Sequence, residues 1–148
     1  MAARDDEEVN PLQAYVGFHL RLAQEAYFAE FRRRTGLKEL RPGLFAILAI
    51  IEKNPGINQT TLGQLNGRQK STLTTSLRAL ERRGLVRRER VAADRRNYAL
   101  ALTEAGRAKL AEFWIHARAT EDALVATVGE AKTAALLEIL KQVWGGLG

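Results

Sequence analysis

The chain has 148 residues, 46% hydrophobic and 27% charged, with a formal net charge of +6, which is typical of one folded domain that buries its own core. It contains no cysteine and two histidines, His19 and His116. Disulfides and thiolate chemistry are therefore excluded, and neither a multi-histidine metal cage nor a cofactor is expected. The acidic start lacks the apolar run of a secretory signal, and no run approaches the roughly 20 apolar residues that span a bilayer, which favours the cytoplasm and argues against a membrane partner.

The first predicted element is a long helix over residues 10–34. Asn10 can cap the free amides of a helix start, and Pro11 suits the first helical position. The residues that follow are rich in alanine, leucine and aromatic side chains, and they present more apolar surface than one solvent-facing helix needs. Three arginines at the end complement the negative end of the helix: Arg32, Arg33 and Arg34.

Two further helices are predicted next. Pro42 opens the first, whose apolar residues follow the i, i+3, i+4, i+7 pattern of a helix packed on a core: Leu44, Ile47, Leu48 and Ile51. Asn54-Pro55-Gly56 ends this helix. Asn58 then caps a short helix over residues 59–65, which closes at Asn66-Gly67, where glycine can adopt a positive φ angle.

A fourth helix, predicted over residues 69–83, has two contrasting faces. At about 100° per residue, its leucines form a narrow stripe for burial: Leu73, Leu77 and Leu80. The opposite face carries hydroxyls followed by arginines, with no acid among them: Ser71, Thr75, Arg78 and Arg82. Gly84 ends the helix.

After this helix the spacing of apolar residues changes to the alternation that is typical of β-strands, and a β-hairpin is predicted. Residues 85–90 and 97–102 are predicted as two short strands, because apolar residues alternate with small or polar ones in the second segment. The connection over residues 91–96 carries two arginines at or near its tip.

Two helices are predicted at the end of the chain. Thr103 can cap the first, which runs to about residue 125. The second covers residues 130–144 and carries a broad apolar stripe that ends in Trp144. The terminal helices together carry more apolar surface than a monomer of this size buries, which favours self-association.

Positive charge is concentrated in one segment. Residues 67–110 contain 12 basic and 4 acidic residues, a net charge of +8, whereas residues 1–40 and 111–148 carry −1 and −2. A solvated face normally interleaves both signs, so this excess indicates a polyanionic partner. The short helix, glycine turn and following helix form a helix-turn-helix, whose second helix enters the major groove of double-stranded DNA.

The candidate DNA contacts lie on that second helix and on the hairpin. On the helix they are Gln69, Lys70, Ser71, Thr72, Thr74, Thr75, Arg78 and Arg82. Arg78 is long enough to bind a guanine edge with two hydrogen bonds, and a phosphate clamp is its alternative role. On the hairpin, Arg95 or Arg96 suits the narrow minor groove of A·T-rich DNA. Asp94 repels phosphate, so we expect it to pair with an arginine or a backbone amide and shape the tip.

Five short motifs follow one another over about half the chain: Asn54-Pro55-Gly56-Ile57, Lys70-Ser71-Thr72-Leu73-Thr74, Leu80-Glu81-Arg82-Arg83-Gly84-Leu85-Val86-Arg87-Arg88, Asp94-Arg95-Arg96 and Leu102-Thr103-Glu104-Ala105-Gly106. In this order they resemble the MarR family of winged helix-turn-helix transcription regulators. The resemblance implies a mainly helical fold: a winged domain with a two-stranded β-wing, residues 39–103, flanked by dimerisation helices, residues 1–38 and 104–148, in one intertwined unit. It also implies a homodimer on a palindromic operator, with half-sites about 10 base pairs apart.

The resemblance further implies a small-molecule effector, often an aromatic acid, bound between the dimer helices and the winged domain. On this sequence the lining residues would be Phe18, His19, Leu22, Phe45, Leu48, Phe113 and Trp114. Aromatics at helical spacing also serve as ordinary core, and that alternative stays open here. His19 is the sharper candidate, because an imidazole among apolar groups needs a partner that a ligand carboxylate would provide.

The second predicted helix and Leu77-Arg78-Ala79-Leu80-Glu81-Arg82-Arg83-Gly84 resemble one branch of the family. That branch is associated with the catabolism of hydroxycinnamates and related aromatic acids, and some of its members sense the CoA thioester. A thioester would need basic groups at the pocket mouth, for which the candidates are Arg21, Arg41 and the triplet Arg32-Arg33-Arg34.

The leading hypothesis is a repressor that an aromatic carboxylate or aromatic acyl-CoA releases from its operator. The effector would do so by binding more tightly to the conformation of the repressor that does not bind DNA. The alternative is a constitutive DNA-binding protein without an effector. A protein–protein adaptor with a vestigial winged motif is disfavoured by the basic helix face. An enzyme is disfavoured because the sequence offers no paired nucleophile and base, no glycine-rich phosphate loop and no metal set.

Overall fold

The computed structural model describes residues 10–36, 42–67, 70–91 and 94–147. This part of the chain is mainly helical, with one two-stranded sheet, in the order α1 (Val16–Thr35), α2 (Pro42–Lys53), α3 (Gln59–Asn66), α4 (Lys70–Arg82), β1 (Val86–Val91), β2 (Asp94–Leu102), α5 (Glu104–Val128) and α6 (Glu130–Leu147). The predicted fold class, a helical protein with a two-stranded wing, is confirmed. We call α2, α3, α4, β1 and β2 the winged domain, and α1, α5 and α6 the arm.

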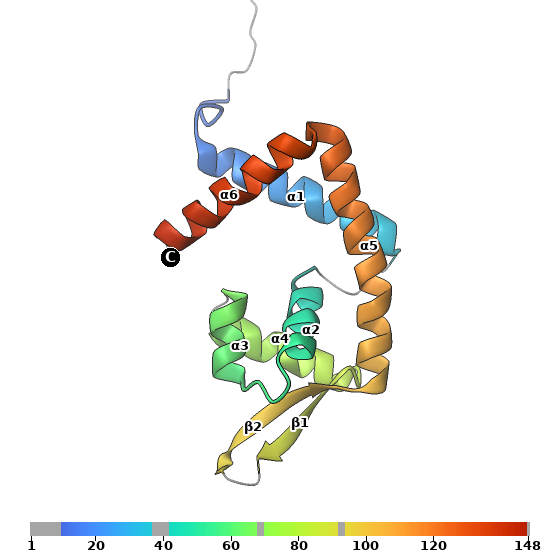
Figure 1. The fold of residues 1–148 in the computed structure, drawn as a ribbon. Helices are drawn as coiled ribbons and strands as arrows, with labels where there is room; N and C mark the ends of the chain where they lie inside the picture. Colours follow the sequence, from blue (N-terminus) through green and yellow to red (C-terminus); the bar gives the residue numbers. More distant parts are fainter. Residues whose placement is uncertain (1–9, 37–41, 68–69, 92–93, 148) are drawn as a thin grey trace, which may run out of the picture.

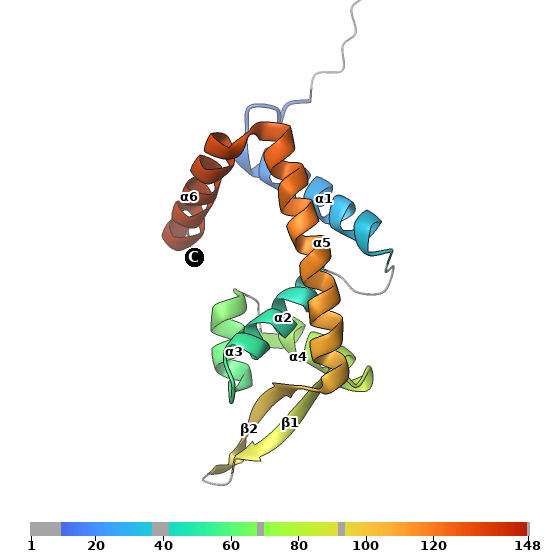
Figure 2. The same cartoon turned by 45° about the vertical axis from the view of Figure 1, so that its right-hand side comes forward.

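The arrangement of these two parts is visible in Figure 1. The hairpin projects at one end of the molecule, and the α5–α6 junction lies at the other. The long helix α5 runs between them, α1 crosses it in the arm, and α6 folds back toward α3. Figure 2 shows the same arrangement after a turn of the molecule, with α6 still standing apart from the winged domain along most of its length.

The first helix begins later than predicted. Asn10 does act as a capping residue, because its Oδ1 accepts a hydrogen bond from the Leu12 amide at 2.9 Å, but it caps only the turn over residues 11–14. Tyr15 then has extended backbone angles, φ −100° and ψ 122°, and α1 starts after it. An extended residue interrupts helical hydrogen bonding, so the turn and the helix stay separate. The three arginines lie in the last turn of α1, as predicted.

The winged domain has an apolar core that the predicted stripes build. Leu73, Leu77 and Leu80 of α4 are fully buried, as the two-faced pattern predicted. They pack in one cluster with buried residues of α2, α3 and the sheet, and with buried residues of α1 and α5: Ile47, Leu48, Ile51, Leu62, Val86, Leu100, Leu102, Phe31, Leu110, Phe113 and Ala117. Because this side of α4 is held by the core, its opposite side points outward.

The hairpin is antiparallel and is tied to the helices. Val86 pairs with Leu102 and Arg90 with Tyr98, and the register shifts before Val91 pairs with Asp94. The Leu100 amide donates to the Ile57 carbonyl at 2.8 Å, which fixes β2 to the segment between α2 and α3. The second strand starts at Asp94, so the prediction that residues 94–96 belong to the connection is wrong. Pairing across the register shift extends the ladder toward the tip.

The base of the wing is locked to the start of α5. Thr103 Oγ1 accepts the Gly106 amide at 3.0 Å, which confirms the predicted helix cap, and donates to the Gly84 carbonyl at 2.5 Å. Gly106 is buried against the Leu85 backbone, where a side chain has no room. The start of the long helix α5 is therefore fixed to the base of the wing.

The arm leaves much of its apolar surface uncovered. α1 packs on α5, and the described residues of α6 include none that are buried. The exposed apolar side chains of α6 are Leu136, Leu137, Ile139, Leu140, Trp144 and Leu147. Only near its end does α6 approach the winged domain, where the Trp144 indole lies beside Gly67, 3.4 Å from the point that a Cβ on that glycine would occupy.

Candidate nucleic-acid interface

The helix-turn-helix is built by α3, Gly67 and α4. Asn58 Oδ1 accepts the Thr61 amide at 2.9 Å and caps α3, as the sequence predicted. Gly67 follows α3 with φ +61°, a left-handed conformation that residues with a side chain rarely adopt. The chain then enters α4, whose buried leucines fix the rotation of the helix about its axis. The helix start therefore stands at the surface beside the turn.

The outward face of α4 matches the predicted set of polar and basic side chains. Among the described residues the exposed members of that set are Lys70, Ser71, Thr72, Thr75, Arg78 and Arg82. A surface hollow of about 480 Å³ lies on this face and is lined by Thr75, Arg78, Glu81 and Arg82. Arg78 and Arg82 form no ion pair with any other described residue. Their guanidinium groups are therefore available for an anion.

Thr74 differs from the other predicted contacts on this helix. Its hydroxyl donates to the Lys70 carbonyl at 2.9 Å and accepts from Gln59 Nε2 at 2.8 Å. The side chain is half-buried and joins α3 to α4. It is placed to hold the two helices together, while Thr75, which donates to the Ser71 carbonyl at 3.2 Å, is exposed. Gln69 lies outside the described residues.

Two of the acids in the basic segment are neutralised by β1. Arg87 pairs with Glu89, with its Nη2 2.6 Å from the carboxylate, and Arg88 pairs with Glu81 at 2.6 Å from its Nε. Both acids are thereby matched within the wing and its base. The positive charge of Lys70, Arg78 and Arg82 is left uncompensated by acids in the described part of this surface, which strengthens its potential toward polyanions.

The wing arginines lie on the second strand. The backbones of Arg95 and Arg96, like that of Asp94, belong to β2 at the far end of the hairpin (Figure 1). Their side chains fall outside the described residues, as does the connection at residues 92–93. The minor-groove role of the arginines and the shaping role of Asp94 stay predictions.

The residues predicted to bind an effector divide into two groups. In the first, Phe113 and Leu48 are fully buried core residues. Phe45 contacts Phe113 edge-on with centroids 5.9 Å apart and Trp114 with centroids 5.0 Å apart. Trp114 is partly exposed at the edge of this cluster. Leu48 and Phe113 are therefore ordinary core residues in this structure, which is the alternative that the sequence left open. Phe45 and Trp114 lie where the cluster meets the surface.

The second group lies at the start of α1. Phe18 and His19 meet edge-on with ring centroids 5.5 Å apart, and the Arg21 guanidinium lies over the Phe18 ring at 5.4 Å. His19 Nε2 is 2.8 Å from the Gln13 carbonyl oxygen, so the imidazole has a partner within its own chain. Leu22 is exposed. Arg41 lies outside the described residues.

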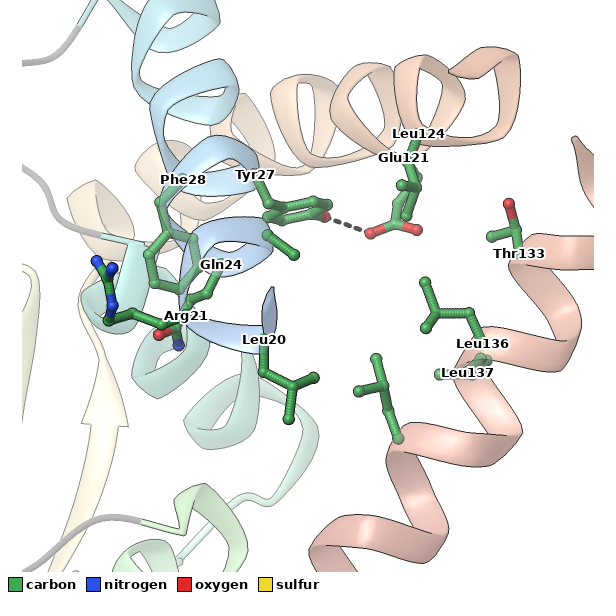
Figure 3. Close-up of a pocket in the computed structure, with 12 residues that line it drawn as sticks. Leu20, Arg21, Gln24, Tyr27, Phe28, Glu121, Leu124, Thr133, Leu136 and Leu137 are labelled. Carbon is green, nitrogen blue, oxygen red and sulfur yellow. Dashed lines mark hydrogen bonds between the residues drawn. The ribbon is translucent and has the colours of Figure 1, made fainter. Parts of the chain in front are cut away.

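A groove between α1, α5 and α6 was not predicted from the sequence. It has a volume of about 690 Å³ and is lined by Leu20, Arg21, Ala23, Gln24, Tyr27, Phe28, Glu121, Leu124, Thr133, Leu136, Leu137 and Leu140. Figure 3 shows leucines of α1 and α6 facing one another across it, with the Tyr27 hydroxyl directed at Glu121. Burial, and then the Glu121 carboxylate that accepts its hydrogen bond, raise the pKa of the Tyr27 phenol above its usual value. The apolar stripe of the last helix was the available signal, but the pairing of Tyr27 with Glu121 joins residues distant in sequence.

The described ranges, residues 10–36, 42–67, 70–91 and 94–147, hold neither a metal-binding cluster nor a membrane-spanning helix. They contain no group of three or more histidine, cysteine, aspartate or glutamate residues placed to hold a metal ion. No helix among them is long and apolar enough to cross a membrane.

Comparison with known proteins identifies the family. A model described as the MarR family matches residues 40–98. A transcriptional regulatory protein described for the hcr operon of Thauera aromatica is 32% identical over 130 residues, which cover 87% of this chain and 78% of that protein.

Solved structures of the transcriptional repressor CouR are also similar. CouR bound to a 23-mer DNA duplex has a TM-score of 0.80 at 35% identity, over 86% of this chain and 91% of that one. CouR bound to p-coumaroyl-CoA has a TM-score of 0.79 at 32% identity, over 86% and 90%. The winged domain seen in the structure and the sequence identity along most of these chains point to the same family. The chain therefore belongs to the MarR family of transcriptional regulators, which are not enzymes.

Proposed function

We propose that this protein is a dimeric, sequence-specific DNA-binding repressor that a small aromatic acid or its CoA thioester releases from a palindromic operator. The observation that carries the proposal is the exposed face of α4, where Ser71, Thr75 and Arg78 stand opposite a fully buried leucine stripe. Hydroxyls and arginines in this arrangement suit base edges and phosphates in the major groove. The DNA-bound structure of CouR, a repressor, supports the same use of this fold.

The homodimer is supported by the arm. The groove between α1, α5 and α6 and the outer side of α6 expose leucine, isoleucine and tryptophan side chains together. Contiguous apolar surface of this kind marks an interaction site. Because a two-fold dimer uses the same surface on both copies, the arm of a second chain is its proposed occupant, and two α4 helices then face one side of a duplex.

The effector class is supported by one similar protein and by the aromatic side chains. CouR has been solved with p-coumaroyl-CoA, and in this chain Phe45 and Trp114 lie at the surface edge of the aromatic cluster. We propose these two residues for the aromatic ring, and Phe18, His19 and Leu22 at the start of α1 for other parts of the ligand. Arg21 and Arg41 are proposed for negatively charged groups of the ligand.

A binding selection tests the proposal. The native chain selects duplexes from a random-sequence library, and the selected duplex is then used in fluorescence anisotropy titrations with p-coumaroyl-CoA, p-coumarate and free CoA. We expect a selected sequence with two-fold symmetry and release by one of the two aromatic compounds. A selected site without symmetry contradicts the dimeric reading, and release by neither compound favours the constitutive DNA-binding alternative.

A further inference from the structure

A chain of hydrogen bonds links the wing to α3 and to both ends of α4. Arg88 of β1 donates through Nε to Glu81 Oε1 at 2.6 Å and through Nη1 to Gln59 Oε1 at 3.3 Å. Gln59 in turn donates to the Thr74 hydroxyl at 2.8 Å, and Thr74 donates to the Lys70 carbonyl at 2.9 Å. One guanidinium on the wing therefore holds α3 and α4 together through a continuous polar network.

The position of Glu81 gives this network a consequence for binding. Glu81 lines the same surface hollow as Arg78 and Arg82. Arg78 precedes Glu81 by three residues, a spacing at which charged side chains on a helix meet. The Glu81 carboxylate thus has two possible cationic partners, Arg88 behind the face and Arg78 on it, and in this structure it is bound to Arg88.

The pair between Arg88 and Glu81 is well placed to persist. The two side chains are 31% and 26% exposed, so solvent screens them less than a fully exposed pair. The planar guanidinium also bonds two acceptors at fixed angles, which a lysine ammonium does less well. Arg87, its neighbour on β1, is bound instead to Glu89 and to the Leu102 carbonyl, away from α4.

We propose that Arg88 is a positioning residue for DNA binding, which keeps the Glu81 carboxylate away from Arg78 and so leaves the α4 arginines free for the duplex. The inference rests on the proposed DNA-binding function. Without Arg88, Glu81 pairs with Arg78 and adds negative charge to the face that meets phosphate. Gln59 Oε1 also loses the hydrogen bond that it accepts from Arg88, a bond that helps to orient the Gln59 amide toward Thr74.

The test compares four variants on the duplex that the native chain selects from a random-sequence library. Fluorescence anisotropy measures the dissociation constant at several KCl concentrations for Arg88→Ala, Glu81→Gln, the double variant and Arg87→Ala. The last removes one positive charge from the same strand and is the matched control. We expect Arg88→Ala to weaken binding about tenfold, the size of a charge-assisted contact, and Arg87→Ala to weaken it about twofold.

The double variant separates positioning from direct contact. If the released carboxylate causes the loss, Arg88→Ala combined with Glu81→Gln recovers to within about threefold of the native affinity. If Arg88 itself binds a phosphate, the double variant stays as weak as Arg88→Ala. The slope of log affinity against log salt for the double variant is then smaller in magnitude than that of the native chain by about 0.9. Either of those two results overturns the positioning role.

Two further measurements keep the outcome decisive. Thermal unfolding by circular dichroism shows whether Arg88→Ala folds, and Arg88→Lys, which keeps the charge but not the forked geometry, replaces it if it does not. Arg88→Lys is then expected to lose less affinity, and again to be rescued by Glu81→Gln. If the native chain selects no duplex, the proposed function fails. If the native chain binds and Arg88→Ala binds equally well, only the role of Arg88 fails.

Discussion

The winged domain and the last helix of the arm, α6, treat their apolar side chains in opposite ways. In α4 of the winged domain, Leu77 and Leu80 are 0% exposed, whereas in α6 of the arm Leu137 is 53% exposed and Trp144 is 68% exposed. Both helices carry leucine at helical spacing. The difference lies in what covers them, because the leucines of α4 lie in a core that α1 and α5 help to close, whereas α6 borders an open groove.

This difference separates two tasks within one chain. The polar face of α4 is oriented by contacts inside the same chain, so its shape does not depend on a partner. The arm sets how two such faces stand relative to each other, provided a second copy covers it. A ligand that alters the arm or its joint with the winged domain would then change the spacing of the two faces without unfolding either of them.

The strongest way to break the comparison is to damage the core that holds α4. Leu77→Ala removes a fully buried side chain and should lower the free energy of unfolding by about 2–5 kcal/mol. Urea unfolding followed by circular dichroism measures the loss. Leu65→Ala, at an exposed leucine of α3, is the control and should change stability little. Equal losses at the two positions would mean that the core is not where the structure has it.

The second test addresses the arm. Leu137→Glu places a charge on the exposed side of α6, and burying it against a second copy should weaken the dimer about a hundredfold, or ~2.7 kcal/mol. Analytical ultracentrifugation over a range of concentrations measures this shift toward monomer. Lys132→Glu, on an already polar exposed position of the same helix, is the control. An unchanged association constant for Leu137→Glu would leave the groove without its proposed occupant.

The third test compares one arginine from each region. Arg78→Ala on α4 should cost about 1–3 kcal/mol at the selected duplex and relax the preference at one base pair. Arg118→Ala, on an exposed position of α5 in the arm, removes the same charge and should cost much less. Anisotropy titrations on the selected duplex and on its single-base variants measure both. Uniform weakening on every sequence would assign Arg78 to a phosphate instead of a base.

The smallest expected effect concerns helix caps. Asn58→Ala removes the cap of α3 and should lower stability by about 1 kcal/mol. In the arm, α1 has no side-chain cap at Tyr15, so Tyr15→Ser should be neutral or gain a few tenths of a kcal/mol. Thermal unfolding of both variants shows the contrast. A larger loss at Tyr15 than at Asn58 would indicate that Tyr15 packs on something that covers the arm.

Local patterns in the sequence were enough to predict most of the winged domain. Three leucines at helical spacing identified the buried side of α4, and Asn58 and Thr103 were recognised as caps that the structure confirms. These features depend on neighbours within one or two helical turns. The hydroxyls and arginines opposite the stripe could therefore be assigned to the surface without knowledge of the tertiary fold.

Two element boundaries and two long-range hydrogen bonds were missed or misplaced. The late start of α1 follows from the extended backbone at Tyr15, and the longer second strand follows from pairing between Val91 and Asp94. The bond from Tyr27 to Glu121 joins two helices of the arm. None of these features leaves a periodic signal in the sequence, and neither does the bond from Arg88 to Glu81, a residue that lines the hollow beside Arg78.

The most direct test of the central claim asks which part of the chain meets DNA. Because the chain has no cysteine, Thr75→Cys on α4 and Arg118→Cys on α5 each provide a single point for attaching an iron chelate that cleaves nearby DNA. With the selected duplex, we expect the α4 probe to cleave at two symmetric places about one helical turn apart and the α5 probe to leave the duplex intact. Cleavage from α5 alone, or equal cleavage from both positions, would contradict the claim that α4 reads the DNA.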